Sequence, residues 1–516
     1  MTGTLIHGKY VVCNVIDANS AEVITDGAVY QENGMIVRVG RFDDLREEFP
    51  SAERIGSQNH VVMPGLVNAH DHVGMSRFQL GVPHRPLELS SALSLGAKDL
   101  DPYLDHLWGA AQMLESGTTT VQVMYSPGRG ESPIAADLTD KVVRAYRDAG
   151  IRLAFAPILQ DQNSMVSGHN GDEQTFARQL PKDLSQRFLD FMNKGYFPVD
   201  EIISLAEDVF KKYDGSENGR IKVTVAPTNV QRCSDALLMG LRALSQKYDT
   251  TLHIHLLETL YQKFFGLRAY GKTALQHLDS LKFLGPDVIC GHSVWVTDED
   301  IQLLRETRTG VCHNPSSNFR LQSGIAPVPR FLSEGIPVSI GTDDTGINDD
   351  KDMFQEMRLV LRIHRVPGFE HTPPTAHQVF AMATANGGHA CGFGDSIGAL
   401  EAGKKADIVL VDLKRIEEPY LDPDVSIVDA IVHRARGNDV DMVLVDGEIV
   451  VRDGKLLRLD RERLVGEIAQ ALDRPRHPHE IARKELGLEL EPHIRRFYAD
   501  AVKDLSAPHA KYNAQG

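Results

Sequence analysis

The chain has 516 residues, enough for about three average domains or for one α/β barrel with additional units. It carries 55 Lys and Arg against 71 Asp and Glu, a formal net charge of −16, and such an acidic surface argues against nucleic acid as the main partner. Hydrophobic residues make up 42% of the chain, and no apolar stretch approaches the roughly 18 residues needed to span a bilayer, so we expect no membrane insertion.

The N-terminus and the cysteines predict a cytoplasmic protein. Residues 1–9 contain no basic segment followed by an uninterrupted apolar core, which a secretion signal requires. The five cysteines are far apart and never form a C-x-x-C pair, so the chain fits neither a disulfide framework nor a structural zinc knuckle. The 21 histidines instead prompt a search for sites made of imidazoles and carboxylates.

Both ends of the chain contain short β segments with turn residues between them. Near the N-terminus, Asn33 and the glycine after it separate two such segments, which is a strong hairpin signal. A similar pattern returns at residues 407–411 and 442–451. We therefore expect one small composite β-sandwich domain built from residues 1–62 and 395–456.

Between these ends, apolar strand-like runs alternate with amphipathic helical stretches, which favours a parallel sheet covered by helices. The eight runs are residues 61–67, 118–124, 151–159, 221–228, 252–257, 288–295, 310–314 and 337–342. Eight β/α units predict a TIM (β/α)8 barrel over residues 63–394. An open doubly wound sheet has a similar pattern, and periodicity alone does not separate the two.

Two further segments stand outside this pattern. Residues 160–200 form a long insertion after the third strand, rich in Asn, Gln, Gly and Asp, and we expect it to be either a lid or a disordered loop. Residues 457–516 are charged and mostly helical in pattern, with breaks at Pro475 and Pro478. They predict a helical C-terminal extension that either contacts a second subunit or covers the barrel.

The first central strand ends on a pair of histidines, His70 and His72. In an extended chain residues i and i+2 point the same way, so two imidazoles roughly 7 Å apart along the backbone can bind one cation. By itself this pair is a weak signal, because a histidine pair of this kind is more often exposed or structural than bound to a metal.

A second set of polar residues follows other strands: His253, His255, Glu258, His292 and Asp343. In a barrel all the strand C-termini meet on one face, so these residues are expected to converge with the first pair. Imidazole and carboxylate ligands together suit zinc, ferrous iron or a similar ion, and such an ion lowers the pKa of a bound water toward neutrality. The pattern therefore predicts a hydrolytic metal site.

Two members of this set have open roles. His253 shares a strand face with His255 but lies one pleat deeper, so we expect a hydrogen-bonded core histidine there. Glu258 lies where the strand gives way to a loop, and it is either a solvated surface acid or the proton carrier of the site.

With these residues the chain resembles the amidohydrolase superfamily, specifically its aminohydrolase branch, which contains guanine, adenosylhomocysteine and s-triazine hydrolases. The resemblance covers about residues 8–455. It is carried by six blocks in order: PGLVNAHDH (64–72), ESGTTT (115–120), HIHLLET (253–259), GHSVW (291–295), HNPSSN (313–318) running into SGIAPV (323–328), and GTD (341–343). Each block lies at or just after the end of a predicted strand.

The resemblance implies four ligands for one divalent ion: His70, His72, His255 and Asp343. It also implies that Glu258 protonates a ring nitrogen of the substrate while His292 and Asp343 take the proton from water, so that ammonia or an amine leaves. Relatives with two ions need a lysine at the end of the fourth strand, where this chain has Thr228, so one ion is expected. Zinc is the first expectation, with ferrous iron as the alternative.

The substrate pocket is less well defined by the sequence. Asp344 stands where many relatives have glycine, and it either favours an amino-rich or cationic heterocycle or caps the following loop. Tyr125, Gln160 and His313 are pocket candidates by position only. Cys312 is expected to be a packed thiol, because nothing in the sequence suggests a base beside it.

The first hypothesis is a cytoplasmic metal-dependent aminohydrolase that acts on a purine, pterin, s-triazine or similar small heterocycle, and that forms a homodimer or a higher homo-oligomer. The second is a related hydrolase that cleaves an amide, urea or C–Cl bond. The third is a catalytically dead assembly protein, which would need neither the four ligand types nor Glu258 and His292.

Overall fold

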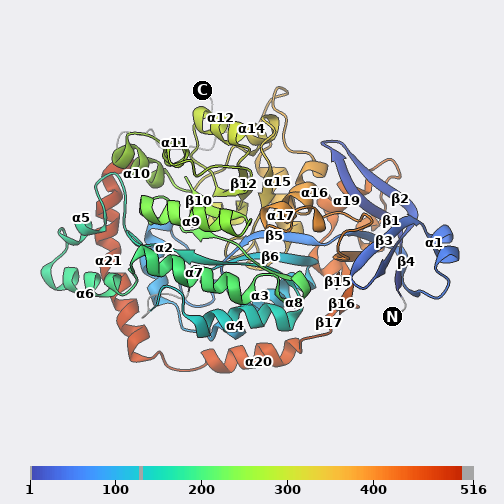
Figure 1. The fold of residues 1–516 in the computed structure, drawn as a ribbon, viewed down its shortest axis with the longest axis horizontal. Helices are drawn as coiled ribbons and strands as arrows, with labels where there is room; N and C mark the ends of the chain where they lie inside the picture. Colours follow the sequence, from blue (N-terminus) through green and yellow to red (C-terminus); the bar gives the residue numbers. More distant parts are fainter. Residues whose placement is uncertain (1–2, 127–131, 503–516) are drawn as a thin grey trace.

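The computed structural model describes residues 3–126 and 132–502, and both ends of the chain contribute to one eight-stranded sheet (Figure 1). Its strand order is β17-β16-β15-β14-β4-β1-β2-β3. The strands are β1 (Thr4–Asp17), β2 (Ser20–Glu32), β3 (Met35–Arg41), β4 (Glu53–Pro64), β14 (Ile408–Asp412), β15 (Val440–Val445), β16 (Glu448–Arg452) and β17 (Lys455–Leu456). The two ends meet where β4 pairs antiparallel with β14. Asn33 and Gly34 have φ of 53° and 80°, as the hairpin signal requires.

The middle of the chain forms two sheets of parallel strands. These are β5 (Leu66–Asp71), β6 (Thr118–Tyr125), β7 (Arg152–Leu159), β8 (Ile221–Val223) and β9 (Ala226–Pro227) in one, and β10 (Leu252–Leu256), β11 (Val288–His292), β12 (Gly310–His313) and β13 (Val338–Ile340) in the other. Two isolated parallel bridges, Asp71 to Asp343 and Val225 to Leu252, join their edges. The parallel α/β arrangement expected from the alternating pattern is therefore present.

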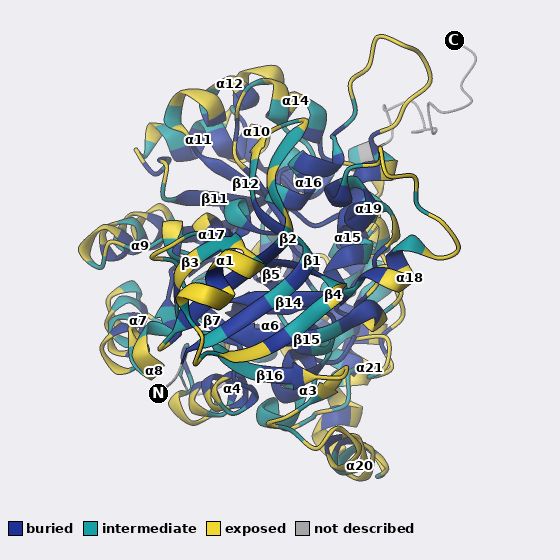
Figure 2. Ribbon diagram, turned by 90° about the vertical axis from the view of Figure 1, so that its right-hand side faces the viewer, coloured by how far each residue is buried: buried dark blue, intermediate teal, exposed yellow. Residues whose placement is uncertain are grey.

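Helices surround these strands on the outside (Figure 1). They are α2 (Leu87–Leu93), α3 (Pro102–Glu115), α4 (Ala136–Ala149), α7 (Val199–Tyr213), α8 (Ser216–Gly219), α9 (Asp235–Lys247), α10 (Leu260–Tyr270), α11 (Ala274–Ser280), α12 (Asp298–Thr307), α13 (Pro315–Arg320), α14 (Val328–Ser333), α15 (Met353–Ile363), α16 (Ala376–Met382) and α17 (Ala385–Ala390). Figure 2 shows buried strands inside and exposed residues on outer helices such as α9. No helix in the described part of the chain is both long and apolar enough to span a bilayer.

Smaller elements complete the two ends of the chain. They are α1 (Phe42–Glu48), α18 (Leu413–Glu417), α19 (Ile427–Arg434), and the 3-10 turns η1 (Ser94–Gly96), η2 (Gly394–Ser396), η3 (Gly437–Asp439) and η4 (Ala499–Val502). Helix α1 begins directly after β3 and covers part of the terminal sheet with Leu45, which is buried.

The first barrel strand begins later than the sequence predicts. The run 61–67 divides at Pro64 and Gly65, because Val61 to Pro64 pair with β14 of the terminal sheet and only the residues from Leu66 onward pair with β6. The fourth run, 221–228, also divides into β8 and β9. The run 61–67 is apolar on both sides of its division, so the pattern does not mark the change of hydrogen-bonding partner there.

The insertion and the C-terminal segment pack on each other. The insertion contains α5 (Glu173–Ala177) and α6 (Lys182–Asn193), and the C-terminal segment contains α20 (Arg461–Leu472) and α21 (Pro478–Tyr498). Phe176, Phe188, Leu490 and Phe497 belong to one buried cluster, separate from the main core. The insertion is thus neither structureless nor isolated: a second small core holds it against α21.

Candidate metal centre

Four side chains from three strand ends converge at one point. His70 belongs to β5 and His72 follows it, His255 belongs to β10, and Asp343 follows β13. One ligand atom from each of the four lies within 4.8 Å of the others. His72 Nε2 is 3.0 Å from both His255 Nε2 and Asp343 Oδ1, and His70 Nε2 is 3.2 Å from Asp343 Oδ1. These donors face a common centre, as ligands of one ion do.

The three imidazoles are oriented by their other ring nitrogens. His72 Nδ1 lies 2.8 Å from the Met124 carbonyl oxygen, and His255 Nδ1 lies 2.7 Å from the Thr228 carbonyl oxygen. Both Nδ1–H groups donate to these carbonyls, which leaves the lone pairs of Nε2 directed at the centre. The residues present therefore fit a divalent ion bound through two imidazole Nε2 atoms of known tautomer.

His70 is oriented by another histidine. Its Nδ1 is 2.9 Å from Nε2 of His253, and both rings are buried. His253 is thus the hydrogen-bonded core residue that its depth in the strand predicts. Cys312 lies beside this pair and is fully buried, and burial raises the pKa of its thiol to about 12, so it is a packed thiol.

The protonation of these groups suits metal binding. Burial lowers the pKa of His70 and of His255 well below the ordinary value, so both imidazoles are neutral, the form that binds a metal. Burial raises the pKa of Asp343, but hydrogen bonds with His70 and His72 outweigh burial and hold it well below the ordinary value. Burial lowers the pKa of His72, but the hydrogen bond and the charge of Asp343 outweigh burial, so the pKa of His72 is raised overall. A bound ion would compete with the proton on the His72 imidazole.

Glu258 and His292 lie beside this cluster. Glu258 Oε1 is 3.9 Å from His292 Nδ1, and Glu258 is only 4% exposed, so it is not a solvated surface acid. Burial raises the pKa of the Glu258 carboxyl group, which favours the protonated form that donates. His292 Nδ1 donates to Asn318 Oδ1 at 2.8 Å, so its Nε2 carries the lone pair, and Asn314 Nδ2 lies 3.4 Å from that nitrogen.

The backbone at this face adopts an unusual conformation. His292 has φ of 67° and Asp343 has φ of 63°, in the left-handed region that residues other than glycine rarely adopt. Both residues follow or end a strand at the predicted site. Strain of this kind is concentrated at functional positions, where the surrounding structure compensates for it.

The four pocket candidates fall into two groups. Gln160 follows β7 and accepts a hydrogen bond from the Thr228 hydroxyl at 3.3 Å. Asp344 Oδ2 lies 3.6 Å from Arg320 Nη2, while its buried Oδ1 has no hydrogen-bond partner among the described residues. Both residues lie next to the cluster. Asp344 follows Asp343 in the chain, and Gln160 is hydrogen-bonded to Thr228, whose carbonyl oxygen accepts from His255.

Tyr125 and His313, the other two pocket candidates, contact aromatic rings outside the ligand cluster. The centroid of the Tyr125 ring lies 5.4 Å from that of His106 in α3. The centroid of the His313 ring lies 5.5 Å from that of His364, the residue that follows α15. Side chains alternate along a strand, and the neighbour of each, Met124 or Cys312, takes the inner side. Substrate binding by Tyr125 or His313 therefore stays a prediction.

Two residues that position the site were not singled out by the sequence. Ser317 donates its hydroxyl hydrogen bond to Asp343 Oδ2, and Asn318 holds His292. Both lie in the segment HNPSSN at 313–318, whose final residues form α13. The motif is present in the sequence, but only the structure shows which of its side chains contact Asp343 and His292.

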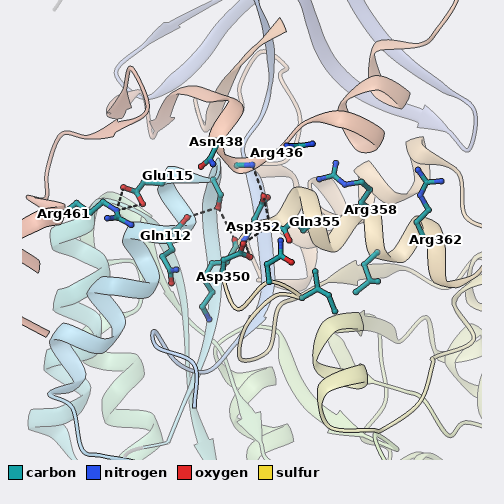
Figure 3. A pocket seen from close by; sticks show the side chains of 16 residues that line it. Gln112, Glu115, Asp350, Asp352, Gln355, Arg358, Arg362, Arg436, Asn438 and Arg461 are labelled. Atoms are coloured by element: carbon teal, nitrogen blue, oxygen red, sulfur yellow. Dashed lines mark hydrogen bonds and ion pairs between the residues drawn. The ribbon is translucent and has the colours of Figure 1, made fainter. Parts of the chain in front are cut away.

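A cavity of about 700 Å³ lies elsewhere, between α3, α15 and η3 (Figure 3). Its lining includes several arginines, and these are engaged in the fold: Arg358 donates to the Ala435 carbonyl oxygen at 2.7 Å, and Arg461 pairs with Glu115 at 3.1 Å. Neither the four ligand residues nor Glu258 and His292 line this cavity. Cavity size therefore does not locate the chemistry here.

A ring of parallel strands with a His/Asp cluster, a buried Glu and a buried His at its C-terminal face is typical of a metal-dependent hydrolase. Comparison with known proteins agrees, because the model of the amidohydrolase family matches residues 61–450. The chain belongs to the amidohydrolase family.

Relatives with known names narrow this class. The 5'-deoxyadenosine deaminase of Methanosarcina mazei is 31% identical over 482 residues, which cover 92% of this chain and 98% of that protein. The 5-methylthioadenosine/S-adenosylhomocysteine deaminase of Syntrophomonas wolfei is 32% identical over 457 residues, with 87% and 94% covered. The chain is thus a hydrolase acting on C–N bonds, and these relatives support hydrolytic deamination of a heterocycle.

Solved structures show the same fold. An adenosine deaminase from Xanthomonas campestris with bound zinc is 26% identical, with a TM-score of 0.74 and coverage of 91% of this chain and 98% of that one. The atrazine chlorohydrolase of Arthrobacter aurescens, complexed with zinc, is 22% identical, with a TM-score of 0.74 and coverage of 91% and 100%. The second likeness concerns the fold alone.

Proposed function

We propose that this chain is a zinc-dependent hydrolytic deaminase of the adenine ring in a small nucleoside. The observation that carries the proposal is the convergence of His70, His72, His255 and Asp343 beside the buried Glu258. The named relatives point to the substrate class, since both deaminate adenosine-type nucleosides according to their names. Among the purines, pterins and s-triazines that the sequence allows, the purines are therefore the first class to test.

The four ligand residues would hold the ion, and the chemistry that an ion supplies at such a site is a water of lowered pKa. Glu258, whose pKa is raised by burial, donates its proton to the ring nitrogen next to the amino-bearing carbon. His292 Nε2 and Asp343 accept the proton of the attacking water. The carbon gains the water oxygen, and the amino group takes up a proton and leaves as ammonia.

The proposal includes one ion per chain. Relatives with two ions bridge them by a lysine at the end of the fourth strand, and here Lys222 in β8 instead donates to the Gly392 carbonyl oxygen at 2.7 Å. The three imidazoles and one carboxylate suit zinc, with ferrous iron as the alternative. The zinc-bound adenosine deaminase among the solved structures supports zinc.

Asp344 and Gln160 are the proposed substrate-binding residues. The unpartnered Oδ1 of Asp344 is an acceptor that suits an amino group, and Gln160 offers an amide next to Thr228. Either contact would orient the base. A base bound in another orientation would leave a buried polar group unpaired, which costs affinity.

The proposed organisation follows the predicted division of the chain. The barrel would comprise residues 63–394, the composite β domain residues 1–62 and 395–456, and the helical extension residues 457–516. We expect a cytoplasmic homodimer or higher homo-oligomer that needs neither nucleic acid nor a membrane. The five cysteines are all buried and free, which a reducing compartment permits.

The test is ammonia release from a substrate panel by the purified, zinc-loaded protein. The panel contains 5'-deoxyadenosine, 5'-methylthioadenosine, S-adenosylhomocysteine, adenosine, guanine and a chloro-s-triazine with alkylamino groups, and Glu258→Gln serves as the matched inactive control. We expect at least one adenine nucleoside to release ammonia with wild-type protein only. Release of chloride or an alkylamine from triazines, with no ammonia from any nucleoside, would overturn the proposal in favour of the related hydrolase that cleaves other bonds.

A further inference from the structure

A buried ion pair lies directly behind the metal centre. The side chains of Lys351 and Asp71 are both 0% exposed, and Lys351 Nζ lies 2.8 and 2.7 Å from the two carboxylate oxygens of Asp71. The same ammonium donates to the Val73 carbonyl oxygen at 2.7 Å and to the Asp344 carbonyl oxygen. One buried cation thus binds Asp71, the residue two positions after it and the loop that follows β13.

These contacts cross the seam at which the ring of strands closes. Asp71 lies between the ligands His70 and His72, and the Asp343 backbone bonds both of them: Asp343 N donates to the His70 carbonyl oxygen and His72 N to the Asp343 carbonyl oxygen, each at 2.8 Å. The isolated bridge between Asp71 and Asp343 is the same junction. Lys351 therefore joins the segments that carry three of the four ligands.

The remaining lone pairs of Asp71 are also satisfied. Asn68 Nδ2 donates to Asp71 Oδ2 at 2.9 Å, and the Thr342 hydroxyl donates to the same oxygen at 2.7 Å. A buried ion pair survives only when its geometry is good and its other polar atoms are paired, and both conditions hold here. Because every partner is fixed and water is excluded, the network has one arrangement rather than several.

We propose that Lys351 is a positioning residue of the metal centre, whose ammonium holds β5 and the loop after β13 in the register that brings His70, His72 and Asp343 together. This inference rests on the proposed function, since it assigns a role toward the ion that those residues would bind. A neutral side chain of similar length fills the space, but it leaves the carbonyl oxygens of Val73 and Asp344 without a donor. The two segments then separate, and the ligand geometry loosens.

The test compares Lys351→Met with the double variant D71N/K351M, which removes both charges together and carries the test if the single variant does not fold. The matched control is Arg152→Met, because Arg152 forms another buried ion pair, with Asp407 at 2.7 Å, at the start of β7 and away from the ligands. The readouts are the Kd for Zn²⁺ by chelator competition, the visible spectrum with Co²⁺, and the melting temperature of the metal-free protein.

We expect both Lys351 variants to bind Zn²⁺ at least tenfold more weakly, the lower end of what supporting residues contribute, and to change the Co²⁺ spectrum. Arg152→Met should lose melting temperature but keep the Zn²⁺ affinity. Folded Lys351 variants with wild-type Zn²⁺ affinity and spectrum would overturn the inference and leave the proposed function intact. A wild-type protein that binds no Zn²⁺ would instead refute the metal site itself, and this role with it.

Discussion

Replacing Glu356 by Gln should stabilise the protein at pH 8 much more than at pH 5. Glu356 in α15 is 0% exposed, and it accepts hydrogen bonds from the backbone N–H and the hydroxyl of Ser316. Burial raises the pKa of its carboxyl group to about 7, from an ordinary value of 4.5. A Gln side chain keeps an acceptor for the N–H and a donor for the hydroxyl oxygen, but it has no charge to bury.

The sign follows from proton linkage. Between the pH at which the carboxyl ionises in the unfolded chain, near 4.5, and the pH at which it ionises in the fold, about 7, the folded protein holds more protons. The free energy of unfolding of the wild type therefore falls as pH rises through this window. At about 1.4 kcal/mol per pKa unit, the full loss is roughly 3.4 kcal/mol, of which about 2.5 kcal/mol lies between pH 5 and pH 8.

The assay is the difference in melting temperature between Glu356→Gln and wild type, measured at both pH values. For a chain of this length the unfolding entropy converts about 2.5 kcal/mol into a shift on the order of 2 °C. Other titrating groups affect both proteins alike and cancel in the difference. Glu370→Gln, which removes the same charge from an exposed position, is the control. An equal shift at pH 5 and pH 8 would refute the reasoning, because it would mean that Glu356 is already ionised in the fold at low pH.

Three further substitutions test the site itself. His255→Ala removes one of four ligands, so purified protein should contain far less than one divalent ion per chain by elemental analysis; a full complement would contradict the assignment. Glu258→Gln should lower kcat for deamination by roughly 10²–10⁴, the range for a general acid, with metal content unchanged; full activity would remove Glu258 as the donor. A Cβ at Gly341 would lie 2.6 Å from His70 Cβ, so Gly341→Ala should weaken Zn²⁺ binding while Gly335→Ala, in open space, should not.

The convergence of the four candidate ligands could be predicted because its signal is local in the sequence. Each of His70, His255 and Asp343 lies at or just after the end of a strand, and parallel strands of a ring place their C-terminal ends on one face. No distance needed to be known for that expectation. The start of the first parallel strand could not be predicted, because Val61 and Leu66 belong to one apolar run. Only their pairing shows that Val61 belongs to the terminal sheet and Leu66 to the parallel one.

Pocket residues depend on finer geometry than strand position. Tyr125 and His313 are the last residues of β6 and β12, and one residue of register decides whether a side chain faces the centre or the helices. Met124 and Cys312 take the inner positions instead. Lys351 has no signal in the sequence, because its partner Asp71 lies 280 residues away and Lys351 itself belongs to none of the six blocks.

The ion pair between Asp344 and Arg320 changes the substrate that Asp344 leads one to expect. As a free carboxylate in an acidic protein, it would favour a cationic heterocycle. Arg320 Nη2 lies 3.6 Å from Asp344 Oδ2 and 3.9 Å from Asp343 Oδ2, and its other nitrogen donates to the Thr345 carbonyl oxygen at 2.9 Å. The guanidinium therefore offsets one of the two adjacent negative charges. Because Arg320 offsets part of this negative charge, Asp344 gives less reason to expect a cationic heterocycle, and the neutral adenine base of the proposed function is compatible with it. The net charge of −16 says little about the substrate.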